Sequence, residues 1–399
     1  MIAKPKENGI SSRADRDWTT IPFGEFATLQ RGKDLTKSQF RDGPFPVGGS
    51  NGIIGYHDTA IVNGPGITVG RSGSAGKITY FEQDFWPHNT ALYVKDFHGN
   101  DPLFTRYFFT HLDLSRFKTG ASVPTLDRNT FKMLPVAVPA LPVQKKIACI
   151  LLTVQQAIEA QEQIIQTTTE LKKGLMHKLF TEGVRNEPQK QTEIGPVPES
   201  WEMLPLGLLA KVGNGSTPKR DNQSFWQDGT IPWLNSARIH DRFITEPDQF
   251  VTDLAVKQCH LPRVKPNSLL IAITGQGKTL GNSAITRFET CINQHLAYAQ
   301  FTTEKIIPDF VLWFMQTRYE FLRSIAQAGG STKGALTCGY LKTLLIPVPT
   351  IGEQREIVST FNALDRKDKI AARKRDRLQA LFRTLLHQLM TAQIETKDF

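Results

Sequence analysis

An internal duplication constrains this chain more than any other feature of its 399 residues. Positions that open the first half recur 183 positions later, and later positions recur at offsets of 204 and then 206. From Leu126 to Thr181 the offset is 210 throughout. The chain therefore contains two related copies, and its fold must contain one kind of unit twice. The matched pairs are Trp18/Trp201, Pro22/Pro205, Gly24/Gly207, Ala27/Ala210 and Gly32/Gly215 at 183; Asn89/Asn293 and Leu92/Leu296 at 204; Pro102/Pro308, Phe104/Phe310 and Phe108/Phe314 at 206; and Lys132/Lys342, Leu134/Leu344, Val138/Val348, Pro139/Pro349, Gln144/Gln354, Leu175/Leu385, His177/His387 and Thr181/Thr391 at 210.

The change in offset separates each copy into two parts. A stretch that matches without gaps indicates packing in which an insertion would shift the register, whereas drifting offsets are typical of loops that tolerate change. Each copy therefore has a variable head followed by a rigid tail. The heads are predicted to be α+β, because short β-type runs such as Gly66–Val69, Leu92–Val94 and Leu269–Ile273 alternate with glycine-rich turns. A helical stretch follows in each head, at Pro102–Phe117 and Pro308–Gln327.

The two tails are predicted to be long amphipathic helices. Apolar residues recur at steps of three and four, which places them on one stripe of a helix, and no proline interrupts either run. About 40 residues would make a helix roughly 60 Å long, and its stripe needs a partner, for which the other tail is the obvious candidate. The stripe residues include Ile147, Leu151, Val154, Ile158, Ile165, Leu171, Leu175 and Leu179 in the first tail and Ile357, Phe361, Leu364, Ala371, Leu378, Phe382, Leu385 and Leu389 in the second.

The linker between the copies favours antiparallel helices. Thr181–Ser200 is polar and holds Gly183, Pro188, Gly195, Pro196 and Pro198. A parallel pair would require this linker to travel back roughly 60 Å, close to its limit of about 3.3 Å per residue. An antiparallel pair needs only a turn. The predicted fold is an α+β protein with two heads, two long antiparallel helices in a coiled coil, and pseudo-twofold symmetry.

Composition indicates a soluble, cytoplasmic protein and is compatible with a polyanionic partner, although charge alone does not establish one. Basic side chains number 48 and acidic ones 38, so the formal charge is +10, which is compatible with nucleic acid. No apolar run is long enough for a membrane span, and Met1–Arg16 lacks the apolar core of a signal peptide. The cysteines at 149, 259, 291 and 338 have neither disulfide nor zinc-site spacing.

Motifs for catalysis are missing from the sequence. Gly70–Lys77 resembles a phosphate loop, but Arg71 stands at its required first glycine and Ile78 follows the lysine; in the second copy Ala272 replaces that glycine. No nucleophile elbow, zinc-protease motif or adenine-methyltransferase tetrapeptide is present. Trp18 and Trp201 are interpreted as packing residues at the edges of the heads. The chain is therefore predicted not to be an enzyme, with no catalytic, cofactor-binding or metal-binding residues.

These features together resemble the specificity subunit of type I restriction-modification systems. The resemblance rests on the Val138-Pro139 and Val348-Pro349 endings, the glutamines that follow them, the Leu175–Thr181 segment, the Ile194–Trp201 segment and the Gly-Ser-Ala-Gly-Lys loop. It covers Trp18 to Thr391, with one departure: Asp15–Trp18 lacks the full Gly-Pro-Val-Pro of the second copy.

The resemblance implies that each head is a target recognition domain that reads one half of a bipartite DNA site. The helices would be conserved spacer regions that set the distance between half-sites and dock two methyltransferase subunits, which restriction subunits then join. S-adenosylmethionine, ATP and magnesium would belong to those partners, and no membrane is implied. The expected organisation is an N-terminal extension at 1–17, recognition domain 1 at 18–140, spacer helix 1 at 141–182, a linker at 183–200, recognition domain 2 at 201–350, spacer helix 2 at 351–392 and a C-terminal tail at 393–399.

Polar and basic loop residues are the candidate DNA contacts, because Arg, Asn, Gln, Ser and Thr can read base edges while Lys mostly contacts phosphates. A solvated surface role is the alternative for each of them, and Asn89 and Asn293 would also suit a turn shared by the heads. The candidates in the first head are Arg31, Lys33, Ser50, Asn51, Arg71, Ser72, Ser74, Lys77, Asn89 and Ser122. Those in the second head are Lys219, Arg220, Asn235, Arg238, Gln276, Lys278, Thr279, Asn293, Gln294, Ser331 and Lys333.

Two other functions remain open from the sequence. The chain could be a scaffold whose coiled coil and heads bring proteins together without DNA, which a steep loss of DNA affinity with salt would exclude. It could instead be the specificity subunit of a related defence system with a fused methyltransferase-nuclease, which neighbouring genes would show.

Overall fold

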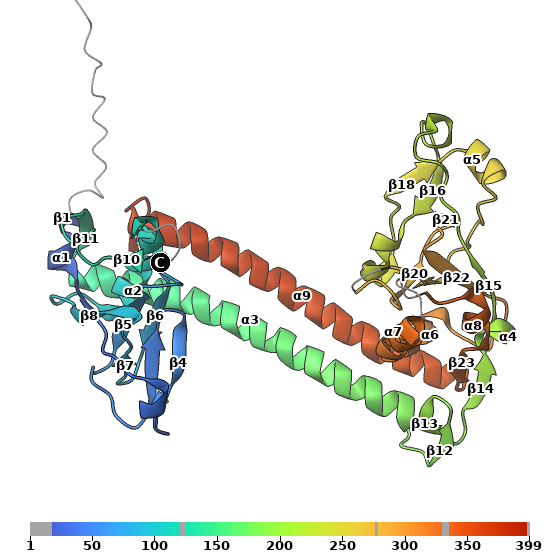
Figure 1. Ribbon diagram of the computed structural model, residues 1–399, viewed down its shortest axis with the longest axis horizontal. Coiled ribbons are helices and arrows are strands. Elements are labelled where there is room, and N and C mark those ends of the chain that lie inside the picture. Colours follow the sequence, from blue (N-terminus) through green and yellow to red (C-terminus); the bar gives the residue numbers. More distant parts are fainter. Residues whose placement is uncertain (1–17, 120–124, 276–277, 329–334, 397–399) are drawn as a thin grey trace, which may run out of the picture. The chain divides into compact units, whose positions relative to one another are not determined.

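The computed structural model describes residues 18–119, 125–275, 278–328 and 335–396. The chain divides into two compact units, and each is described by itself. Unit 1 comprises residues up to Gln163 together with those from Ala371 onward, and unit 2 comprises Ile164–Ile370. Each unit therefore contains one head and one end of each long helix (Figure 1).

Head 1 is a mixed α+β domain in unit 1. Among the described residues, β1 pairs antiparallel with β11, a four-stranded antiparallel sheet has the order β2-β8-β5-β6, and a smaller sheet has the order β4-β3-β7 with β3 and β7 parallel. Helix α2 packs on β5 and β6 (Figure 1). The bounds are β1 Trp18–Pro22, α1 Phe23–Phe26, β2 Thr28–Arg31, β3 Phe45–Gly49, β4 Gly52–His57, β5 Gly66–Gly70, β6 Ile78–Phe81, β7 Trp86–Pro87, β8 Ala91–Asp96, α2 Pro102–Leu112, β9 Lys118–Thr119, β10 Thr125–Leu126 and β11 Pro135–Pro139.

Head 2 repeats this plan within unit 2 and enlarges it. Strand β14 pairs with β23 as β1 does with β11, the main sheet has the order β15-β22-β19-β20-β17, and a second sheet has the order β18-β16-β21. The bounds are β12 Gln189–Thr192, β13 Gly195–Pro198, β14 Glu202–Pro205, α4 Leu206–Leu209, β15 Ala210–Asn214, β16 Ile231–Leu234, β17 Phe243–Ile244, β18 Gln249–Val251, α5 Asp253–Gln258, β19 Leu269–Ala272, β20 Ser283–Thr286, β21 Cys291–Ile292, β22 Leu296–Phe301, α6 Pro308–Thr317, α7 Tyr319–Ala328, α8 Cys338–Thr343 and β23 Leu345–Val348.

The two tails form the long helices α3 (Leu141–Thr181) and α9 (Ile351–Met390). In unit 1 the core of head 1 takes in Leu151 near the start of α3 and Leu389 at the end of α9. In unit 2 the core of head 2 takes in Phe180 at the end of α3 and Phe361 near the start of α9. The helices therefore run in opposite directions, as the linker predicts. Supercoiling of the pair stays a prediction.

The helical stretch predicted at Pro308–Gln327 is divided into two helices. Helix α6 ends at Thr317 and α7 begins at Tyr319. Between them the Arg318 N–H bonds to the carbonyl oxygen of Met315, three residues back, at φ −96° and ψ 0°, which is not helical geometry. In head 1 the corresponding stretch ends its α-helix at Leu112, where Asp113 adopts a left-handed conformation with φ 51°.

A buried glutamine fastens the start of each long helix to its own head. Gln144 is 2% exposed and Gln354 is 0% exposed. The Gln144 Oε1 accepts from the backbone N–H of Asp101, the N-cap of α2, at 2.9 Å, and its Nε2 donates to the Pro139 carbonyl at 2.9 Å. Gln354 makes the same two bonds, to the N–H of Ile307 (2.7 Å) and the carbonyl of Pro349 (2.8 Å).

A second contact, between head and helices, differs in chemistry between the units. In unit 1 the Tyr107 hydroxyl donates to Gln155 Oε1 at 3.0 Å, and its ring lies 5.9 Å from that of Phe382. Burial raises the pKa of Tyr107 to about 12, so this contact is neutral. By the offsets of 206 and 210, the equivalent residues in unit 2 are Trp313, Asp365 and Lys172.

The equivalent contact in unit 2 is charged. Asp365 accepts from the Lys172 ammonium at 2.5 Å and from the guanidinium of Arg242 in head 2. Both cations lie over the Trp313 ring, at 4.6 Å and 4.7 Å from its centroid. Burial lowers the pKa of Lys172 although Asp365 acts in the opposite direction, so one carboxylate holds two partly desolvated cations.

Removing the glutamine amide is expected to destabilise the fold. The Gln354→Ala variant leaves the Ile307 N–H and the carbonyls of Pro349 and Lys305 without their partner, which should lower the free energy of unfolding by about 2–3 kcal/mol. Urea unfolding followed by far-UV circular dichroism would measure this.

The control is Gln166→Ala on α3, because Gln166 is exposed and its side chain donates to Glu170 within the same helix. That substitution should change the free energy of unfolding by less than about 0.5 kcal/mol. Equal effects from both variants would contradict the role assigned to the buried glutamine.

Candidate nucleic-acid interface

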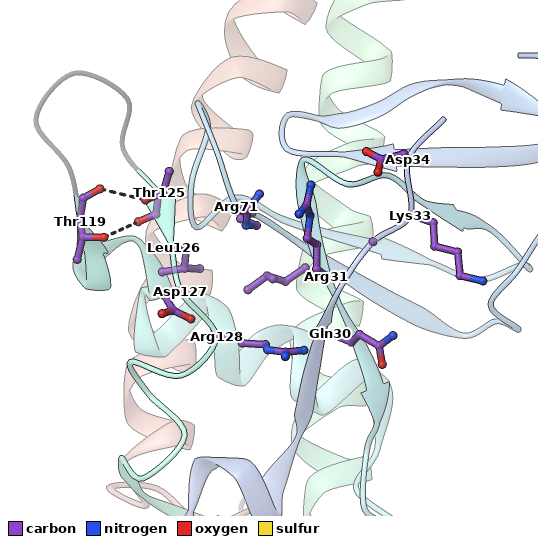
Figure 2. A pocket seen from close by; sticks show the side chains of 12 residues that line it. Gln30, Arg31, Lys33, Asp34, Arg71, Thr119, Thr125, Leu126, Asp127 and Arg128 are labelled. Carbon is purple, nitrogen blue, oxygen red and sulfur yellow. Dashed lines mark hydrogen bonds between the residues drawn. The ribbon is translucent and has the colours of Figure 1, made fainter. Parts of the chain in front are cut away.

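A groove of about 830 Å³ in head 1 brings together basic side chains from distant parts of the sequence. Arg31 comes from the end of β2, Arg71 from the turn after β5, and Arg128 from the segment after β10. Figure 2 shows these side chains around the groove, while Lys33 extends away from the others. Asp34 and Asp127 also line it. Guanidinium groups that converge on an open groove suit phosphate oxygens or the acceptor edges of bases.

Gly32, directly after β2 in head 1, and Gly215, directly after β15 in head 2, have the same structural role. A Cβ on Gly32 would overlap the carbonyl oxygen of His88, and a Cβ on Gly215 would overlap that of Ile292. Only glycine, which has no Cβ, lets the backbone pass this close to the neighbouring segment in each head. The residue after each glycine then donates its backbone N–H across the gap: Lys33 to the Pro87 carbonyl at 2.9 Å, and Ser216 to the Ile292 carbonyl at 3.0 Å.

The loop after this glycine is anchored at one equivalent carbonyl in each head. The Trp86 indole N–H donates to the Lys33 carbonyl at 3.4 Å, and the Trp233 indole N–H donates to the Ser216 carbonyl at 3.2 Å. One residue further on, side-chain hydrogen bonds join Asp34 to Asn89 and Thr217 to Gln294. The two heads thus share a loop scaffold and present different side chains on it.

Several predicted contacts in head 1 lie on the glycine-rich loop Gly70–Lys77 or on the turn between β3 and β4. Lys77 Nζ donates to both the carbonyl and the Oδ1 of Asn51 at 2.9 Å, so these two predicted residues bond to each other. The Ser50 N–H donates to the Thr90 hydroxyl at 3.2 Å, and the Arg71 N–H donates to the Thr90 carbonyl at 2.9 Å. Ser72 and Ser74 are half-buried on the same turn.

In head 2, several predicted residues have intramolecular partners. Asn235 Oδ1 accepts from the Ala237 N–H at 2.7 Å and so caps a short 3₁₀ helix. Arg238 pairs with Asp241 at 2.8 Å, and the Thr279 hydroxyl lies 3.3 Å from His240 Nε2. Asn293 is 5% exposed, and its Oδ1 accepts from the His295 N–H at 3.1 Å, as a turn residue does.

Apart from the buried Asn293, the predicted residues divide by exposure. Arg31, Lys33, Asn51, Lys77, Lys219, Arg220, Lys278 and Gln294 are exposed. Ser50, Arg71, Ser72, Ser74, Asn89, Asn235, Arg238 and Thr279 are half-buried. Ser122, Gln276, Ser331 and Lys333 lie outside the described residues.

Sequence reasoning missed Arg128 and the tryptophans that hold the loops. Arg128 follows a strand remote in sequence from Arg31, so only folding brings them into one groove. The available signal was a basic residue just after the glycine-containing segment that precedes Leu126. Trp201 is fully buried, and its indole donates to Glu353 at 3.1 Å, in agreement with its predicted packing role.

The described residues hold neither a metal-ion cluster nor a membrane-spanning helix. None of their His, Cys, Asp and Glu side chains forms a group of three or more that could hold a metal ion. No helix in this part of the chain is long and apolar enough to cross a membrane.

Comparison with known proteins identifies the family. The model of the type I restriction modification DNA specificity domain matches residues 15–170 and again residues 198–380. A putative type I restriction enzyme specificity subunit of Methanocaldococcus jannaschii is 25% identical over 408 residues, covering 98% of this chain and 91% of that protein.

Two solved structures share the fold. The S subunit of a type I restriction-modification system from M. genitalium has a TM-score of 0.66 at 17% identity, covering 94% of this chain and 96% of the other. A chain from work on complex assembly and conformational transition of the type I system has a TM-score of 0.51 at 15% identity, covering 94% and 98%.

The two matches to this domain, one in each copy, define a DNA specificity protein. The chain belongs to the type I restriction modification DNA specificity domain family and carries two copies of that domain. It functions as the specificity subunit of a type I restriction-modification complex.

Neutralising the groove arginines is expected to weaken DNA binding and its dependence on salt. The double variant Arg31→Gln, Arg71→Gln removes two cations that line one groove. Each phosphate that is no longer neutralised by the protein should reduce the slope of log affinity against log salt by about 0.9. Titration of a duplex bearing the recognition sequence, at several salt concentrations, measures the slope.

The matched control removes two arginines that are already paired with carboxylates. Arg263 bonds to Glu289 at 2.9 Å, and Arg375 bonds to Asp376 at 2.7 Å. The double variant Arg263→Gln, Arg375→Gln should keep the original slope. A slope that falls equally in both double variants would mean that only net charge matters and that the groove has no special role.

Proposed function

We propose that each head reads one half of a bipartite DNA sequence and that the two long helices fix the distance between the half-sites. The observation that carries this proposal is the shared loop scaffold. Equivalent carbonyls of Lys33 and Ser216 are held by indole N–H groups, while the side chains beyond them differ between the heads. One scaffold with two sets of side chains suits two readers of different sequences.

The assembled complex would supply the chemistry that this chain does not. Two methyltransferase subunits would dock on the helices and modify adenine N6 with S-adenosylmethionine, and restriction subunits would add cleavage that depends on ATP and Mg²⁺. This chain would bring both activities to one DNA sequence in the cytoplasm. Two long helices between the readers suit that division of labour, since half-site spacing on DNA is a geometric property of the protein.

The experiment that tests the proposal is base-resolved methylation mapping of host DNA with and without this gene, in cells that express the neighbouring methyltransferase gene. Deletion should remove methylation from one bipartite motif and leave other motifs unchanged. An unchanged methylome, with the methyltransferase shown to be present, would favour a scaffold without DNA specificity.

Exchanging one head is expected to change one half-site only. Trp18 and Pro139 face each other at the end of the β1–β11 ladder, so a segment cut at these residues closes on itself. Replacing residues 18–139 with the same segment of a relative should change one half of the methylated motif. Methylation mapping would show the new motif, and a change in both halves would contradict independent readers.

Lengthening the helices is expected to change the spacer and leave the half-sites intact. Seven residues inserted after Gln163 and seven after Ile370 keep the apolar stripes in phase and extend each helix by about 10 Å, close to three base pairs of DNA. Mapping should show the same half-sites at an altered spacing. Retention of the original spacing would show that the helices do not set it.

A further inference from the structure

A short loop in head 2 is anchored at both ends by tryptophan. The Trp233 indole N–H donates to the Ser216 carbonyl at 3.2 Å, and the Trp226 indole N–H donates to the Lys219 carbonyl at 3.0 Å. Trp233 is 1% exposed and belongs to a buried cluster with Phe225. Two indole N–H groups, from buried Trp233 and half-buried Trp226, therefore hold the backbone that leads into Arg220.

The Arg220 side chain lies in the corner between these two rings. Its guanidinium carbon is 3.9 Å from the centroid of Trp226 and 4.9 Å from that of Trp233. The rings are 5.2 Å apart and nearly perpendicular, at 89°. Cation–π attraction to two such faces restricts a side chain that is otherwise among the most flexible.

The donors of Arg220 remain available. Among the residues that the structure describes, no hydrogen bond or ion pair engages its guanidinium, whereas Arg238 in the same head is paired with Asp241. Arg220 is exposed and lines an open groove of about 730 Å³ with Trp226, Asp228, Asp248 and Phe250. The carboxylate of Asp248 accepts from Asn235 at 3.3 Å.

We infer that Arg220 is a specificity-determining residue that reads a guanine in the half-site bound by head 2. This inference rests on the proposed function of the heads. A planar guanidinium with free N–H groups matches the O6 and N7 acceptors of guanine in the major groove. Since Trp226 and Trp233 already restrict the side chain, less conformational freedom is lost on binding, and a base that lacks these acceptors leaves the donors unpaired. The neighbouring Lys219 supplies a point charge suited to phosphate.

The test uses the complex of this chain with its methyltransferase subunits. Exchange of residues 18–139 first assigns the half-site that remains unchanged to head 2. Competition binding then measures duplexes in which each base pair of that half-site is changed in turn. The unaltered complex should prefer guanine at one position by roughly 5- to 150-fold.

The variants separate base reading from charge and packing. Arg220→Lys keeps the positive charge and loses the planar fork, so it should abolish the preference at that one position and preserve the preferences at the others. Arg220→Gln should do the same if it folds, which circular dichroism checks. The matched control Lys219→Ala should weaken binding to every duplex by a similar factor and leave the pattern of preferences unchanged.

Two results would overturn the inference. One is a head 2 half-site without guanine on either strand; the other is an Arg220→Lys complex that keeps every base preference. Failure of the proposed function is distinguishable, because then no bipartite motif is found and exchange of head 1 changes no half-site.

Discussion

The buried amides of Gln144 and Gln354 are the contacts on which the position of each head depends. Each satisfies the N-cap N–H of a head helix and a carbonyl just before a long helix, so one side chain joins three segments. A buried amide forms all of these bonds in one geometry only. The same geometry recurs at both positions, in agreement with the gap-free match from Leu126 to Thr181 in which the glutamine repeats at the offset of 210.

The architecture was predictable from the sequence where packing admits no insertion. The constant offset from Leu126 delimited the tails, and their apolar periodicity identified the long helices. The linker favoured an antiparallel pair, because a parallel pair would stretch it close to its limit. The break at Arg318 was not predictable, since no proline or glycine lies near it and it depends on one backbone conformation.

The candidate interface was predictable only in part, because its members meet through tertiary structure. Arg31 and Arg71 were identified as polar loop residues, but Arg128 joins them through a strand pairing that no periodicity reveals. Asn293 shows the opposite limit. Its side chain type suits a base contact, yet it is buried and bonds to the backbone of its own turn. Residue type therefore indicates a candidate, and exposure decides whether it can reach a ligand.

The charged contact in unit 2 has a consequence for how new specificities can arise in this chain. Arg242 and Trp313 belong to head 2, while Lys172 and Asp365 belong to the helices. A foreign head inserted there must bring its own arginine and aromatic ring, or Lys172 and Asp365 are left without them. The neutral tyrosine–glutamine contact of unit 1 makes no such demand. Recombination should therefore accept a wider range of donors for the first head than for the second.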